Sequence, residues 1–142
     1  MRARFLSILL TLAPFIGAAQ SSAPTTSGSP TPADAQPEVK ELSPAQLSAM
    51  LGTPNLFIFD CNEPDMFAEA HVPGARPTVY DAVTVEMLPT DPSAVLVFYC
   101  YSPECPAATY AAHTATTLGY TDVHCMIAGI TGWQDAGLPT EP

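Results

Sequence analysis

The stretch that most constrains the fold is the apolar run AVLVFYC at residues 94–100, which ends in a cysteine. Two further short runs, NLFIFD at residues 55–60 and DVHCMI at residues 122–127, are similarly rich in apolar residues. Strands that are apolar throughout are typical of parallel sheets, because helices cover both of their faces. The sequence therefore predicts an α/β protein in which a parallel sheet is flanked by helices on both faces.

Helical segments are expected between these strands. Ser43 is a good N-cap, Pro44 suits the first helical position and Gln46 can complete a capping box, so a helix is predicted up to Leu51. Further helices are predicted in residues 63–70, 106–119 and 129–137, whereas residues 76–92 are compatible with either a strand or a helix. This alternation of strands and helices agrees with the predicted fold class.

The N-terminal third of the chain has a different character. Arg2 and Arg4 precede a short apolar run, and small residues follow at 17–19, which together predict a secretory signal peptide at residues 1–19. That run is too short for a membrane-spanning helix. Residues 20–38 are rich in Ser, Thr, Pro and Ala, which predicts a disordered linker. One domain is expected at residues 39–142, in a periplasmic or secreted protein.

The charge of the chain is strongly acidic. Its formal net charge is −10, and Lys40 and Arg76 are the only cations beyond the predicted signal peptide, against fourteen carboxylates. Such a surface repels nucleic acid and anionic lipid, so neither a nucleic acid nor a membrane is expected as a partner after signal removal. The same charge lowers the local concentration of anionic substrates.

Cys100 is the candidate nucleophile because of the place where it occurs. It lies where a buried strand passes into the loop YSPEC and then into a helix. Backbone N–H groups in such a loop, and the positive end of the following helix, can stabilise a thiolate and a negative species on its sulfur. An enzyme that carries sulfur as a persulfide needs this arrangement.

Three blocks of sequence resemble rhodanese-type sulfurtransferase domains, over nearly all of residues 39–142. They are DCNEPDMFAEAHVPGA at 60–75, VLVFYCYSPECPAATYAA at 95–112 and LGYTDVHCMIAGITGWQDAGLP at 118–139. The resemblance implies that Cys100 carries the sulfur and that Asp60 supports the site from a neighbouring strand end. The expected transfer mechanism requires no cofactor. It also implies that the loop backbone forms the cradle, which comprises Tyr101, Ser102, Pro103, Glu104 and Cys105. His71, Pro73, Gly74 and Trp133 are implied to be structural.

The chain departs from the family pattern at the positions that would supply positive charge. Cys105 stands where the family loop often ends in Arg, and Asn62 replaces an Arg that usually follows the Asp. A persulfide or polysulfide is therefore expected as the donor rather than the dianion thiosulfate. A phosphatase of related fold needs an Arg at the sixth position after the cysteine. This chain has Pro106 there, so phosphatase activity is not expected.

The other cysteines leave several alternatives open. Cys105 can resolve an oxidised or persulfidated Cys100, form a static disulfide with it, or replace the Arg without contact. Cys61 and Cys125 are expected to be buried small hydrophobes, and a bridge between them is an alternative. A zinc site is disfavoured because no second pair of ligands follows at a suitable spacing.

Three functions follow from these observations. The first is an exported sulfurtransferase that uses a small sulfur donor and a thiol acceptor. The second is a thiol–disulfide or redox protein that uses Cys100 and Cys105 together with a redox partner protein. The third is a binding module that keeps the rhodanese fold without catalysis.

Overall fold

The structure is a computed structural model that describes residues 38–142. Its strands are β1 (Lys40–Glu41), β2 (Leu56–Asp60), β3 (Arg76–Pro77), β4 (Val95–Tyr99) and β5 (Asp122–Met126). Its helices are α1 (Pro44–Met50), α2 (Pro64–Glu69), α3 (Ala107–Thr117) and α4 (Gly129–Asp135). The strands form one parallel sheet in the order β1-β5-β4-β2-β3, which places β4 at its centre.

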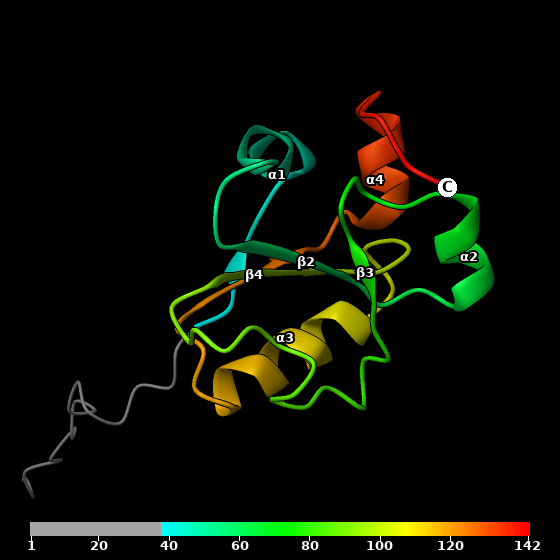
Figure 1. The fold of residues 1–142 in the computed structure, drawn as a ribbon. Helices are drawn as coiled ribbons and strands as arrows, with labels where there is room; N and C mark the ends of the chain where they lie inside the picture. The colour runs from blue at the N-terminus through cyan, green and yellow to red at the C-terminus, as the bar shows by residue number, and fades with distance from the viewer. Residues whose placement is uncertain (1–37) are drawn as a thin grey trace, which may run out of the picture.

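Helix α3 covers one face of this sheet and α1 and α4 cover the other (Figure 1), and a hydrophobic core lies on each face. Successive residues of a strand point to opposite faces, so Phe98 of β4 packs in the core beneath α3, while Tyr99 packs in the core with α1 and α4. Because both faces are covered, the central strands contain few polar residues. The predicted fold class is confirmed.

The local signals explain α1 and α3. The Ser43 hydroxyl accepts a hydrogen bond from the Gln46 N–H, and the Gln46 side chain accepts one from the Ser43 N–H, which completes the predicted capping box. The α3 face that covers the sheet consists mainly of alanines, which allow the helix to lie close to the strands. They are Ala107, Ala108, Ala111, Ala112 and Ala115.

Residues 78–94 form neither of the regular elements that the sequence allowed. The short strand β3 precedes them, and turns and irregular backbone then lead to β4. Val83 and Leu88 are nevertheless buried in the α3 core, and the Tyr120 hydroxyl donates to the Pro89 carbonyl. Side-chain burial therefore holds this segment in place without a ladder of backbone hydrogen bonds.

The predicted signal peptide and all but the last residue of the predicted linker lie in residues 1–37, outside the described residues. Glu38, the last linker residue, is exposed and belongs to no helix or strand. Within residues 38–142, no helix has both the length and the apolar character that crossing a membrane requires.

Candidate functional site

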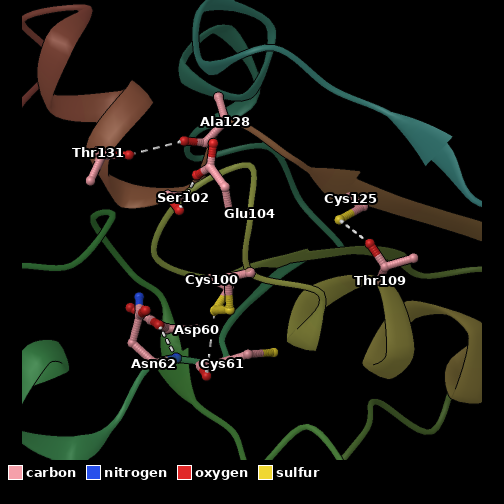
Figure 2. Close-up of a disulfide and its surroundings, with 11 residues drawn as sticks. Asp60, Cys61, Asn62, Cys100, Ser102, Glu104, Thr109, Cys125, Ala128 and Thr131 are labelled. Carbon is pink, nitrogen blue, oxygen red and sulfur yellow. Dashed lines mark hydrogen bonds between the residues drawn. A yellow bond between two sulfur atoms is a disulfide. The ribbon is translucent and has the colours of Figure 1, made fainter.

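The candidate nucleophile lies at the carboxyl edge of the sheet, where parallel strands commonly present ligand-binding residues. Cys100 follows the last residue of β4, and Asp60 ends the neighbouring strand β2, where it is in register with Tyr99. The loop of residues 100–106 then leads directly into α3. Figure 2 shows Cys100 facing Cys61, whose carbonyl oxygen lies 4.0 Å from the Cys100 sulfur.

Cys100 and Cys105 form a disulfide, with their Cα atoms 6.2 Å apart. Of the three alternatives for Cys105, replacement of the Arg without contact is therefore wrong. The pair differs in burial, because Cys100 is only 4% exposed whereas Cys105 is partly exposed. A static bridge and a resolving thiol are both compatible with this geometry.

The first residues of α4 form backbone hydrogen bonds with the start of the loop. The N–H of Ile130 donates to the Cys100 carbonyl at 2.9 Å, and the N–H of Thr131 donates to the Tyr101 carbonyl at 3.0 Å. This close approach depends on Gly129, which has a φ of +66° and at which a Cβ would lie 2.4 Å from the Tyr101 oxygen. Sequence reasoning missed this role, although a glycine two residues after the strand signal at 122–127 was the feature that could have indicated it.

Few of the loop amides remain available for an anion. The Cys105 N–H donates to the Ser102 carbonyl at 3.0 Å, and Pro103 has no N–H. The Glu104 N–H interacts with the carboxylate of its own side chain. The N–H groups of Tyr101 and Ser102 donate to no other described residue. The cradle that the family resemblance implied is therefore reduced to these two unpaired amides and the first turn of α3 as candidate anion-binding groups.

The loop carries a negative charge of its own at Glu104. Its carboxylate accepts a hydrogen bond from the Ser102 hydroxyl at 2.7 Å, and this bond and the one from its own N–H lower the pKa of the carboxyl. Glu104 is exposed and therefore ionised at neutral pH. An anion that approaches the loop meets this charge.

Asp60 belongs to a buried network beside the site. Its carboxylate is 0% exposed and accepts hydrogen bonds from the Tyr99 hydroxyl at 2.5 Å and from the Asn62 N–H at 2.8 Å. The Tyr99 hydroxyl in turn accepts from the Val72 N–H at 3.0 Å. Burial raises the pKa of Asp60, and these hydrogen bonds oppose the rise. None of these hydrogen bonds reaches Cys100, so Asp60 supports the strand ends around the site.

A cleft of about 450 Å³ opens beside the disulfide. Its walls come from the loop, the first half of α3 and the end of β5, and both Cys100 and Cys105 line it. Its lining in the described part of the chain includes Glu104 and His113 but no lysine or arginine. Residues 38–142 contain no cluster of three or more His, Cys, Asp or Glu side chains that could hold a metal ion.

The two cations of the described domain are engaged elsewhere. The Lys40 Nζ atom lies 2.8 Å from an Asp122 oxygen, and the Arg76 guanidinium lies over the Phe57 ring at 5.2 Å from its centroid. Neither residue lines the cleft. The site therefore offers backbone amides, and no cationic side chain, to a negatively charged donor.

Cys61 and Cys125 are buried and not bridged, which confirms that they are small core residues. Burial and, to a lesser extent, the charge of Asp60 raise the pKa of the Cys61 thiol to about 12. Burial likewise raises the pKa of Cys125, whose sulfur lies 3.9 Å from the Thr109 hydroxyl. Both remain protonated at neutral pH and are poor nucleophiles.

The family model of the rhodanese-like domain matches residues 43–136, which span strands β2 to β5, the loop and all four helices. This chain belongs to the rhodanese-like domain family. The match covers every strand except β1 and includes both Cys100 and Cys105.

Solved structures share the fold of this rhodanese-like domain. A protein from Bacillus halodurans is 24% identical with a TM-score of 0.65, over 72% of this chain and 76% of its own. A protein of unknown function from Rhodopseudomonas palustris, termed a possible tyrosine phosphatase, is 24% identical with a TM-score of 0.62, over 72% of this chain and 85% of its own. Thiosulfate sulfurtransferase from Pseudomonas aeruginosa is 28% identical with a TM-score of 0.63, over 75% of this chain but only 20% of its own.

The remaining family motifs of the rhodanese-like domain are structural. His71 is buried, stacks on Phe67 with 3.9 Å between ring centroids, and pairs through its backbone with Glu141. Trp133 is fully buried, and its indole N–H donates to the Pro139 carbonyl at 2.8 Å. The His71 backbone contacts join the C-terminal segment to the chain before β3, and the Trp133 contact joins it to α4.

Proposed function

We propose that the protein is an exported sulfurtransferase of the periplasm or the extracellular space, and that it carries sulfane sulfur as a persulfide on Cys100. The observation that supports this most directly is the position of Cys100. It lies at the carboxyl end of the central strand, beside two unengaged loop amides and the N-terminal end of α3. The predicted signal peptide supports export.

The proposed reaction has two steps and starts from the reduced protein. The Cys100 thiolate attacks the outer sulfur of a donor persulfide, the donor S–S bond breaks, and the donor thiolate leaves. A thiolate acceptor then attacks the outer sulfur of the Cys100 persulfide, and Cys100 leaves as a thiolate. The amides of Tyr101 and Ser102 can stabilise the negative charge of the intermediate.

An organic persulfide or polysulfide is the proposed donor. Thiosulfate carries two negative charges, whereas the cleft presents the Glu104 carboxylate and no cationic side chain within the described domain. The electrostatic contribution that a loop Arg would make to binding an anion is therefore absent.

Sulfur transfer to cyanide by the fully reduced protein tests the proposal. With a polysulfide donor, the wild-type protein is expected to form thiocyanate, and Cys100→Ala is expected to reduce the rate to background. Cys125→Ala is the matched control, since it removes a buried thiol with a raised pKa and should retain most of the activity. Equal rates in the wild type and Cys100→Ala would overturn the proposal, and inactivity of the wild type with every donor would favour a binding module.

The disulfide favours one second candidate, a thiol–disulfide protein that uses Cys100 and Cys105 with a redox partner protein. In that case the pair would transfer electrons and no sulfur atom. The reduced wild type would then reduce a disulfide substrate catalytically, and Cys105→Ser would lose this activity without any requirement for a sulfane donor.

A further inference from the structure

The two sulfur-bearing residues of the disulfide differ in their access to solvent. Cys100 is 4% exposed and is a member of the core cluster under α3. Cys105 is partly exposed and packs against that cluster without belonging to its buried members. A thiol–disulfide exchange begins at whichever sulfur an incoming thiolate can reach in line with the S–S bond. Burial therefore favours Cys105 as the residue that is attacked.

We propose that the disulfide is opened from the cleft by attack of an external thiolate on the Cys105 sulfur. A bond forms between the incoming sulfur and the Cys105 sulfur, the bond between Cys105 and Cys100 breaks, and its electron pair leaves with Cys100 as a thiolate. A second thiol of the reductant then attacks the incoming sulfur and releases Cys105 as a thiolate. The reductant is oxidised to a disulfide, and the protein gains two electrons.

The surroundings of Cys100 suit a leaving group. The exchange is faster when the departing thiolate is stabilised. Cys100 precedes the unengaged amides of Tyr101 and Ser102, and α3 begins only two residues after Cys105. The positive end of this eleven-residue helix stabilises a negative charge at the loop. The Cys100 thiolate that is released is the nucleophile of the sulfur-transfer cycle.

The cleft also selects among thiols by charge. The ionised Glu104 carboxylate lies on its wall, and no lysine or arginine of the described domain balances it. Tyr110 and Ile127, which are 60% and 40% exposed, add apolar surface to the same cleft. A cationic or neutral thiol is therefore favoured over an anionic one. The exchange itself needs no sulfur donor. The inference rests on the proposed function only in the sulfur-transfer role that it gives to the released Cys100 thiolate.

Peptide mapping of a trapped mixed disulfide tests the site of attack. The oxidised protein is mixed briefly with cysteamine, quenched in acid and alkylated with N-ethylmaleimide. Cysteamine is expected on Cys105 and maleimide on Cys100 at the earliest time points. Cysteamine on Cys100 at those times would overturn the inference, while leaving sulfur transfer by the reduced protein unaffected.

A series of thiols tests the selection by charge. At equal thiolate concentration, and with each rate divided by the rate of the same thiol with a small uncharged disulfide, cysteamine is expected to open the disulfide about tenfold faster than mercaptoacetate, with 2-mercaptoethanol between them. Glu104→Gln should narrow this ratio, whereas Asp135→Asn, which removes an exposed carboxylate at the end of α4, should leave it unchanged. Equal normalised rates for the three thiols in the wild type would contradict the role of Glu104.

Discussion

At the scale of single residues, the site combines an accessible sulfur, a buried sulfur and a buried carboxyl. Asp60 has two hydrogen-bond donors and no neighbouring cation in those bonds, so its ionised form has lost water without gaining a salt bridge. Burial consequently raises its pKa above the ordinary value of 3.8. This carboxyl links the pH dependence of folding to the geometry of the strand ends.

Asp60→Asn tests that link. The pKa of Asp60 is higher in the folded protein than in the unfolded chain. Between pH 3.8 and the folded pKa, the folded state therefore binds more protons than the unfolded chain does at the same pH. The stabilisation from Asp60 is therefore complete below 3.8 and is lost across this window, at about 1.4 kcal/mol for each unit of pKa difference. Urea unfolding at a series of pH values should show the wild type losing stability relative to the variant as the pH increases. A constant difference would contradict the account.

At the residue scale, the sequence could predict a property only where that property depends on residues that are neighbours along the chain. Cys100 could be singled out because an apolar run, a loop and a helix follow one another along the chain. The pairing of Cys100 with Cys105 could not be decided, since a disulfide requires a separation in space that four intervening residues do not determine.

At the scale of secondary structure elements, the loop depends on the start of α4. Two N–H groups of α4 hold the carbonyls of Cys100 and Tyr101, and Gly129 allows the helix to approach them. The orientation of the loop amides is therefore set partly by an element that is distant in sequence.

Gly129→Ala is expected to disrupt this contact. The new Cβ would lie 2.4 Å from the Tyr101 oxygen in a backbone conformation that favours glycine, so we expect a loss of about 3 kcal/mol in the free energy of unfolding. Gly137→Ala is the matched control, because its φ of +69° is similar but no atom lies within 4 Å of the new Cβ. It should lose only about 1 kcal/mol. Equal losses in denaturant titrations of the two variants would argue against the packing role of Gly129.

The three central strands and all four helices could be predicted, since apolar runs, caps and turn residues identify them directly. The edge strands β1 and β3 could not, because two residues show no periodicity. Residues 78–94 were ambiguous for a related reason. Their buried residues, Val83 and Leu88, contact the α3 core from irregular backbone, which has no repeating pattern to detect.

At the scale of the whole molecule, the main feature is a strong excess of negative charge. Beyond the predicted signal peptide, fourteen carboxylates face two cations, and both of these cations are engaged away from the cleft. Long-range repulsion therefore adds to the local effect of Glu104 when an anionic donor approaches. The charge balance could be predicted from composition, whereas the place of each cation required the fold.

The donor preference should depend on ionic strength. Salt screens repulsion between exposed charges, so kcat/KM for thiosulfate is expected to rise several-fold between low and physiological ionic strength, while that for an uncharged organic polysulfide should change little. Steady-state rates of the reduced protein with the two donors provide the comparison. A value for thiosulfate that equals the polysulfide value at low salt would contradict the account.

Cys100 is expected to become a persulfide in the reduced protein, and Cys105 is expected to block it in the oxidised protein. Intact-mass and peptide mass spectrometry after incubation with a polysulfide measures this directly. We predict that Cys105→Ser gains one sulfur atom on Cys100 without added reductant, and that the wild type gains it only after reduction. The absence of any added sulfur on Cys100 in Cys105→Ser, or its appearance on Cys61 or Cys125 instead, would contradict the claim.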